Sequence, residues 1–226
     1  LAAIHFFKEN ITDLQVNQKE FVALRDLYQN NFLVSLLKGL SPQERNRMLM
    51  RDLFGHHISN EIADQKTNDF LKFYKQNWIP FHDVIPCLEQ LKSKRLNLGI
   101  ICNGDYDRQV DKLDGLGIKN YFDVITISNQ KGLNKPNKHI FLEACNEANI
   151  KPEQSYYIGD NLVYDAIASK NAGINGIWIN RKNRTTYDDL NVIHSLNELN
   201  NIIKSFIRFI TSHKNTSFSY IYNNKY

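Results

Sequence analysis

The sequence predicts an α/β fold, in which a parallel sheet with helices on both faces follows a leading all-helical region. In residues 1–78, apolar residues recur at helical spacing and glycine and proline are nearly absent. From about residue 81, short β-rich runs alternate with helical stretches, and this alternation is typical of a parallel sheet with crossover helices. A chain of 226 residues that is 42% hydrophobic can bury a core of this size.

Within the helical region, the segment SPQERNRMLMRDLF carries a helix start signal. Ser41 can cap the helix, Pro42 suits its first position and Glu44 completes a capping box. Apolar spacing predicts further helices in FVALRDLYQNNFLVSLL and NEIADQKTNDFLKFY. His56 and His57 are adjacent, so on a helix they would face apart, and we interpret them as loop residues and not as a metal pair.

Four strands are predicted in the second region: LNLGIIC (96–102), YFDVITI (121–127), QSYYIG (154–159) and NGIWIN (175–180). Helices are predicted beside them: VIPCLEQLK (84–92), YDRQVDKLDGL (106–116), KHIFLEACNEA (138–148), VYDAIASKNA (163–172) and, after the capping box of Ser195 and Glu198, LNELNNIIKSFIRFI (196–210). We expect a helical domain over 1–80, the sheet domain over 81–210 and a tail over 211–226.

Composition narrows the class of protein. The formal charge of +4 does not demand a polyanionic partner, so we expect no nucleic acid. The three cysteines lie far apart without ligand spacing, which favours a reducing cytoplasm over a disulfide framework or a zinc site. There is no apolar run long enough for a membrane span and no secretory signal pattern at the start. We therefore expect a cytoplasmic protein; its start without Met is compatible with a sequence that begins partway into the natural protein.

Polar residues follow three of the predicted strands: CNGD (102–105), GLNKP (132–136) and GDNLVYD (159–165). Since the carboxyl ends of parallel strands meet at one edge, these residues should converge there. Asn103 and Gly104 offer donors for phosphoryl oxygens, and Lys135 offers a point charge in a loop stiffened by proline. Asp160 and Asp165 offer hard oxygens for a divalent cation, and Mg²⁺ typically takes only one or two protein carboxylates.

Each of these residues also has a common structural explanation. A strand-end Asn is usually a turn former, a loop lysine is usually solvated, and an Asp near a helix start can complement the helix dipole. Their shared position after three strands favours a site, because turn formers and caps have no reason to coincide there.

The segments CNGD, GLNKPNKHIF and YIGDNLVYDAIASKNAGINGIWINR resemble the second, third and fourth motifs of the haloacid dehalogenase-like (HAD) hydrolase superfamily. The resemblance covers about residues 81–182, and residues 1–78 resemble the helical cap of one branch. It implies a Rossmann-like three-layer core and a phosphatase that acts on a small phosphorylated metabolite through an aspartyl-phosphate. It also implies that Asn103 bonds the transferring phosphoryl group, that Lys135 pairs with nucleophile and phosphate, and that Asp160 and Asp165 position Mg²⁺.

The sequence departs from the family at the first motif, an apolar strand ending in DxDG(T/S) that supplies the nucleophile. Asp105 and Asp107 follow the second motif and cannot replace it. In this fold the missing strand lies in the middle of the sheet, so its loss would leave two neighbours with unpaired backbone groups. We expect little or no phosphatase activity from these residues. A truncated enzyme, another segment in the gap and a degenerate family member all remain open.

The ending RFITSHKNTSFSYIYNNKY is rich in aromatic and basic residues. We favour a frayed terminus over a nucleic-acid contact. A less favoured alternative is that SFSYIY forms a strand, either at an edge of the sheet or in the position of the missing first-motif strand. The junction between the helical region and the sheet region contains Trp78, Phe81 and His82. These side chains are equally plausible as substrate-specificity residues and as packing residues.

The expected partner is a small phosphorylated substrate, with no membrane and a monomer or homodimer as the assembly. One alternative is a non-catalytic domain of the same fold that binds proteins or ligands. A receiver-like signalling domain also uses strand-end acids and a lysine, but the large leading helical region argues against it.

Overall fold

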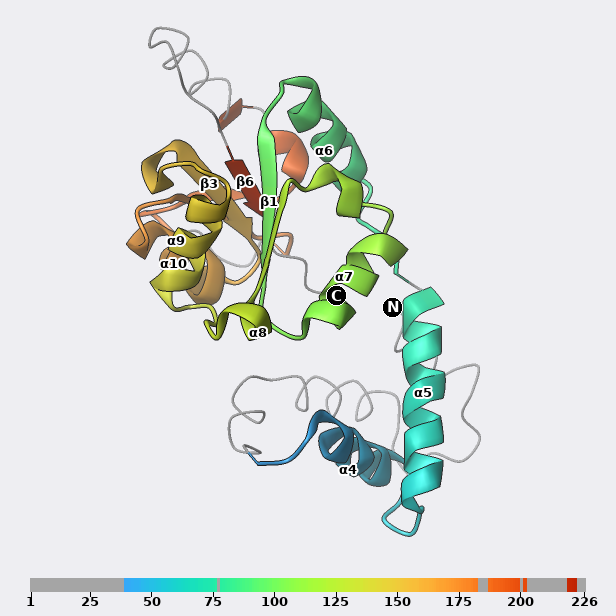
Figure 1. Ribbon diagram of the computed structural model, residues 1–226. Coiled ribbons are helices and arrows are strands. Elements are labelled where there is room, and N and C mark those ends of the chain that lie inside the picture. The colour runs from blue at the N-terminus through green and yellow to red at the C-terminus, as the bar shows by residue number, and fades with distance from the viewer. Residues whose placement is uncertain (1–38, 77, 183–186, 200, 203–218, 223–226) are drawn as a thin grey trace, which may run out of the picture. The chain divides into compact units, whose positions relative to one another are not determined.

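The computed structural model describes residues 39–76, 78–182, 187–199, 201–202 and 219–222 (Figure 1). The chain divides into two compact units, Leu1–Trp78 and Ile79–Tyr226. The helices predicted in FVALRDLYQNNFLVSLL lie outside the described residues. In the described part of the chain, no helix is both long and apolar enough for a membrane span.

Two helices of the first unit are described, α4 (Pro42–Phe54) and α5 (Asn60–Gln76). The predicted capping box is confirmed, since the Ser41 hydroxyl accepts from the Glu44 N–H at 3.2 Å and the Glu44 carboxylate accepts from the Ser41 N–H at 2.7 Å. Arg47 of α4 donates through two nitrogens to Asp64 of α5, at 2.8 and 2.5 Å, which joins the two helices. His56 lies in the turn between them, as predicted.

The second unit contains a six-stranded sheet in the order β2-β1-β6-β3-β4-β5, and every neighbouring pair is parallel. The strands are β1 (Asn97–Cys102), β2 (Val124–Ile127), β3 (Ser155–Gly159), β4 (Asn175–Ile179), β5 (Asn191–Ile193) and β6 (Ser219–Tyr222). The four predicted strands and the α/β fold class are therefore confirmed. β5 was not predicted, because a three-residue run carries too little alternation to stand out.

The strand β6 occupies the middle of the sheet, between β1 and β3 (Figure 1). Its Tyr222 is in register with Ile100 on one side and Ile158 on the other. Of the explanations left open for the missing first-motif strand, the structure shows another segment in the gap, while the frayed terminus favoured for 211–226 was wrong for residues 219–222. The alternative of pairing into the vacant position is confirmed, because β6 supplies backbone partners to both neighbours.

The helices of this unit agree with the predicted positions in most cases. They are α6 (Val84–Ser93), α7 (Tyr106–Gly115), α9 (Lys138–Glu147) and α10 (Ala168–Asn171), with shorter helical turns η1 (Lys119–Tyr121), α8 (Ser128–Lys131), η2 (Pro152–Gln154), η3 (Leu162–Ile167) and η4 (Leu196–Glu198). The helix predicted over 163–172 begins as the π-helical turn η3. The helix predicted over 196–210 is described only near its start.

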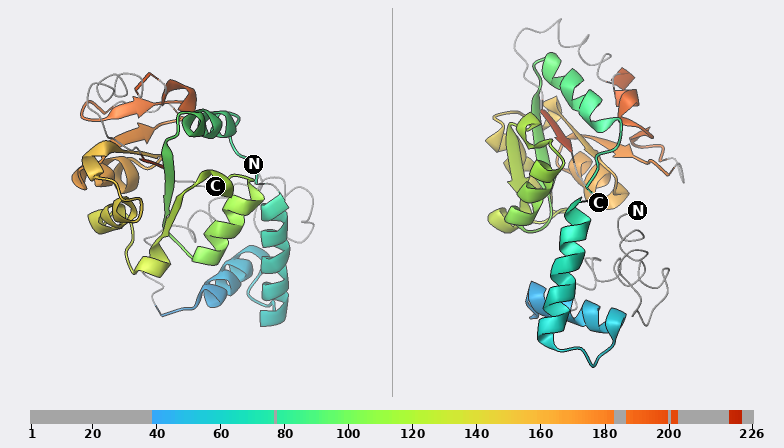
Figure 2. Two further views of the ribbon diagram at one scale, coloured as in Figure 1. Left: turned by 45° about the horizontal axis from the view of Figure 1, so that its top comes forward. Right: turned by 90° about the vertical axis from the view of Figure 1, so that its right-hand side faces the viewer.

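The helices form a layer on each side of the sheet. Figure 1 shows α6 and α7 on one side of β1 and α9 and α10 on the other, and the left-hand view in Figure 2 repeats this arrangement. Ile101 and Tyr157 pack in the core cluster with α9 and α10, whereas Leu98 and Ile158 line an apolar cavity with α6. This division follows the alternation of side chains along a strand.

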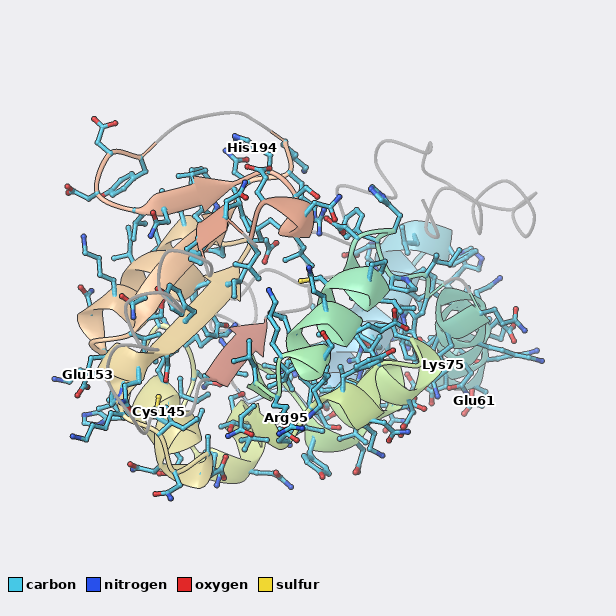
Figure 3. The ribbon with its side chains drawn as sticks, turned by 90° about the horizontal axis from the view of Figure 1, so that it is seen from above. Glu61, Lys75, Arg95, Cys145, Glu153 and His194 are labelled. Carbon is cyan, nitrogen blue, oxygen red and sulfur yellow. The ribbon has the colours of Figure 1, made fainter. Side chains whose placement is uncertain are left out.

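All three cysteines are free and buried, which fits the expected absence of disulfides. Cys145 lies on α9 (Figure 3), where it packs in the core beside Ile140 and Phe141.

A buried carboxylate, Asp83, ties the start of α6 to the chain beyond β4 and β5. It is 1% exposed and accepts from both terminal nitrogens of Arg181, at 2.8 and 2.9 Å, from the Ser195 hydroxyl at 2.7 Å and from the Leu196 N–H at 2.9 Å. Burial opposes ionisation, but these donors prevail and lower the pKa of Asp83 to about 2. The Arg181 guanidinium also lies 4.0 Å from the centre of the Phe81 ring, so Phe81 has a packing role.

Candidate active site at the carboxyl ends of the strands

The predicted site residues follow β1 and β3 at one edge of the sheet, or lie in the loop before α9. The structure brings Asn103, Lys135 and Asp165 into direct contact through hydrogen bonds. Asp160 directly follows β3, and Asp165 lies in the π-helical turn η3 that comes next. The structure therefore brings together three of the predicted residues, Asn103, Lys135 and Asp165.

Asn103 holds the backbone of Lys135 through both ends of its side-chain amide. Its Nδ2 donates to the Lys135 carbonyl at 3.0 Å, and its Oδ1 accepts from the Lys135 N–H at 2.8 Å. This reciprocal pair fixes the loop before α9 against the end of β1. In this arrangement Asn103 positions Lys135, whereas the resemblance implied a direct bond to a phosphoryl group.

The Lys135 ammonium is buried between Tyr157 and Asp165. Lys135 is 4% exposed, and Nζ donates to Asp165 Oδ1 at 2.7 Å and to the Tyr157 hydroxyl at 3.0 Å. The hydroxyl in turn donates to Asp165 Oδ1 at 3.1 Å, which closes a three-membered network. Burial, reinforced by the Asp165 charge, raises the pKa of Tyr157 well above 10, so the phenol stays neutral and keeps its proton for this bond.

The approach of Asp165 to this network depends on Gly159. A Cβ added at Gly159 would lie 2.3 Å from the Asp165 Cβ, a distance that no side chain tolerates. Asp165 Oδ2 accepts from the Asn161 N–H at 3.0 Å, and the Asn161 side chain caps the π-helical turn through the N–H groups of Val163 and Tyr164. The glycine and asparagine of the GDN sequence thus place Asp165 in the core.

The two aspartates predicted as metal ligands differ in environment. Asp165 is fully buried, with both carboxylate oxygens engaged by protein donors. Asp160 is exposed, and its backbone carbonyl accepts from the Trp178 indole N–H at 3.0 Å. Asp160 is therefore open to solvent and suits a metal ligand, whereas Asp165 is arranged to hold Lys135.

Gly104 is also engaged within the protein. Its N–H, predicted as a phosphate donor, donates to the Ser128 hydroxyl at 2.9 Å. Its φ of 129° lies in the region that favours glycine, so the turn after β1 requires this residue type. Asp105 caps α7 by accepting from the Arg108 N–H at 3.1 Å, which is a structural role.

Sequence reasoning missed Tyr157 and Ser128. Tyr157 could have been found, because it lies two positions before Gly159 in a buried strand and a buried phenol needs a partner. Ser128 gave no signal, since its role depends on the end of β2 lying beside the turn after β1.

Among the residues that the structure describes, no group of three or more His, Cys, Asp and Glu side chains could hold a metal ion. A magnesium site does not require such a group, because Mg²⁺ keeps several waters and binds through one or two carboxylates together with substrate phosphate. The exposed carboxylate of Asp160, just after β3, fits that donor set.

Comparisons with known proteins agree with this architecture. The sequence profile of the haloacid dehalogenase-like hydrolase family matches residues 3–179. Glyceraldehyde 3-phosphate phosphatase of Methanopyrus kandleri is 39% identical over 102 residues, which are 45% of this chain and 44% of that protein. Phosphoserine phosphatase of Thermus thermophilus is 31% identical over 94 residues, 42% of this chain and 38% of that protein. The chain thus spans less than half the length of these relatives.

Two solved structures show the same fold. A HAD-hydrolase of Bacillus subtilis bound to magnesium matches with a TM-score of 0.67 and 20% identity, over 89% of this chain and 90% of that chain. A 2-haloacid dehalogenase of Pseudomonas syringae matches with a TM-score of 0.63 and 23% identity, over 91% of this chain and 89% of that chain. The profile match covers well over half of the sequence, and the chain belongs to the haloacid dehalogenase-like hydrolase family.

Proposed function

We propose that the protein is a phosphatase domain that binds the phosphate group of a small phosphorylated metabolite. The observation that carries this proposal is the buried Lys135 ammonium, held by Asp165 and Tyr157 where the loop before α9 meets the end of β1. An ammonium has three N–H donors, and Tyr157 and Asp165 take two of them. The third is the donor that we assign to a phosphoryl oxygen. The phosphatase names of the relatives support this substrate class.

We assign Mg²⁺ to Asp160 and a positioning role to Asp165. When bound, the ion would neutralise charge on the phosphoryl oxygens. Asp165 would act through Lys135, since it holds the ammonium in place and its own oxygens are engaged. This differs from the assignment implied by the resemblance, in which both aspartates position the metal.

Turnover requires an attacking carboxylate, which the family places on the strand of the first motif. In this structure β6 pairs in the middle of the sheet, and the residues that follow it, 223–226, are Asn-Asn-Lys-Tyr, without a carboxylate. We therefore expect these 226 residues to bind phosphate with little hydrolysis of p-nitrophenyl phosphate. Hydrolysis that Asp160→Asn abolishes would contradict the expected inactivity and support the phosphatase assignment.

The proposal is tested by calorimetric titration of the protein with inorganic phosphate in the presence of MgCl₂. We expect Lys135→Met to weaken binding at least roughly tenfold, because a buried charge at the ligand is lost. The control Lys138→Met removes the charge of an exposed lysine three positions away. Its phosphate affinity should stay within about twofold of the wild-type value. Asp160→Asn, at an exposed position that should not disturb folding, should remove the dependence on Mg²⁺.

A wild-type protein that does not bind phosphate at millimolar concentration with Mg²⁺ would refute the proposed function. That result would favour the alternative of a non-catalytic binding domain. One observation favours this alternative: the predicted donors of Asn103 and Gly104 are engaged within the protein.

A further inference from the structure

We propose that Gln109 of α7 is a positioning residue of the candidate site, which fixes the turn after β1 so that Asn103 can hold Lys135. This inference rests on the proposed function and names a further residue of the same site. Sequence reasoning placed Gln109 in a helix and assigned it no part in binding.

The side-chain amide of Gln109 contacts the backbone of the turn that joins β1 to α7. Its Nε2 donates to the Asn103 carbonyl at 3.2 Å. The backbone of Gln109 is itself fixed, because its N–H donates to the carbonyl of Asp105, the N-cap of α7, at 3.1 Å. Helical side chains lean toward the N-terminus of their helix, and this one reaches back past the cap to the end of β1.

Gly104 leaves room for this contact. A Cβ added at Gly104 would lie 3.1 Å from Gln109 Nε2, which is closer than side chains normally pack. The Gln109 amide therefore packs against the α-carbon of Gly104 while it bonds to Asn103. The φ of 129° already favours glycine in this turn, and the approach of Gln109 is a second reason for that residue type.

Two residues after β2 hold the same turn from another side. The Ser128 hydroxyl accepts from the Gly104 N–H at 2.9 Å, and the Asn129 N–H donates to the Gly104 carbonyl at 3.3 Å. Both residues belong to α8. Gly104 is thus fixed by α8, and the Asn103 carbonyl is fixed by α7.

The orientation of this turn decides whether Asn103 can reach Lys135. Both ends of the Asn103 amide engage the Lys135 backbone, at 3.0 and 2.8 Å. Such a reciprocal pair tolerates little rotation, because hydrogen bonds weaken steeply as their angle closes. Rotation of the Asn103 backbone would release the loop before α9. Gln109 opposes that rotation, so it acts on Lys135 through Asn103 and does not touch the ligand.

This series of contacts joins the two helical layers. α7 lies on the opposite side of β1 from α9 and α10 (Figure 1). The Lys135 ammonium bonds to Tyr157, which packs with α9 and α10. Gln109 therefore stabilises the position of Lys135 from the other layer. A fixed ammonium binds a phosphate more tightly, because less ordering remains to be done when the ligand arrives.

Hydrogen exchange of the Lys135 N–H tests the inference directly, because this N–H donates to Asn103 Oδ1. It is measured by NMR in the wild type, in Gln109→Met and in the control Gln130→Met, which changes an exposed glutamine on α8. Gln109 is partly exposed, and methionine keeps its length without the amide, so Gln109→Met should fold normally.

We expect Gln109→Met to speed exchange of the Lys135 N–H about fivefold, which corresponds to the loss of one ordinary hydrogen bond, and Gln130→Met to leave it within about twofold. If Gln109 stabilised only its own helix, exchange would rise for the N–H groups of α7 and not for Lys135, and the inference would be wrong.

Calorimetric titration with inorganic phosphate and MgCl₂ shows whether binding follows. Gln109→Met should weaken phosphate binding roughly three- to fivefold, and Gln130→Met should stay within about twofold. An equal increase in exchange in Gln130→Met, or faster exchange of the Lys135 N–H with wild-type phosphate affinity, would also overturn the inference and leave the proposed function intact. If the wild type does not bind phosphate, the proposed function fails, and the exchange of the Lys135 N–H still decides whether Gln109 positions this residue.

Discussion

The substitution Tyr157→Phe removes one oxygen atom from the network that holds Lys135. The hydroxyl accepts from Lys135 Nζ at 3.0 Å and donates to Asp165 Oδ1 at 3.1 Å, and Tyr157 is 0% exposed. Phenylalanine keeps the ring, which packs edge-on against Phe141 with centroids 4.9 Å apart. The change therefore isolates the two hydrogen bonds.

The expected loss of stability follows from those bonds. A hydrogen bond to a charged group contributes about 1.5–3 kcal/mol, and no water replaces the lost partner in a fully buried site. The direct contact between Lys135 and Asp165 at 2.7 Å remains, so neither charge is left without a partner. We therefore expect the free energy of unfolding to fall by about 2–3 kcal/mol, nearer the value of one such bond than of two.

Guanidinium denaturation of Tyr157→Phe and of Tyr187→Phe measures this loss. Tyr187 is 39% exposed, so its hydroxyl exchanges with water and its removal should change the free energy of unfolding by less than about 0.5 kcal/mol. Phosphate affinity should also fall in Tyr157→Phe, because Lys135 loses one of its two fixed partners. If Tyr157→Phe is as stable as Tyr187→Phe and binds phosphate equally, the Tyr157 hydroxyl does not hold Lys135 in place.

Three further predictions concern the scaffold of the site. Gly159→Ala should lower the free energy of unfolding by about 2 kcal/mol or more, because its Cβ would overlap Asp165; wild-type stability in chemical denaturation would contradict this. The folded-state pKa of Asp83 is depressed to about 2. Ionised Asp83 therefore contributes about 2 kcal/mol to the free energy of unfolding above pH 4, and this contribution is lost as pH falls toward 2. Asp83→Asn should flatten that part of the pH profile of unfolding, and an unchanged slope would refute it. Deletion of residues 219–226 should abolish cooperative thermal unfolding, whereas deletion of 223–226 alone, which leaves β6 in place, should preserve it.

Much of the site was predictable because its positions follow from local patterns. An apolar run that ends in glycine or asparagine marks the end of a strand, and parallel strands bring such ends to one edge. This reasoning placed Asn103 and Asp160 directly after β1 and β3, where the structure has them. The difference between Asp160 and Asp165 was not predictable, because residue type does not show that Asp165 turns into the core against Lys135.

The position of β6 could not be read from the sequence for a different reason. The run SYIY indicates a strand, but a four-residue strand carries no information on which distant strands it pairs with. That choice depends on the free edges that β1 and β3 offer once the rest of the sheet has formed.

The location of β6 has a consequence for the folding of these residues. In the described sheet, β1 and β2 form one block and β3, β4 and β5 form another, and β6 alone bridges them. Both blocks precede the bridge in these 226 residues, so the edges of β1 and β3 that face it stay open until β6 pairs. Open edges recruit other strands, so the pairing of β6 also protects this sheet from association with other chains.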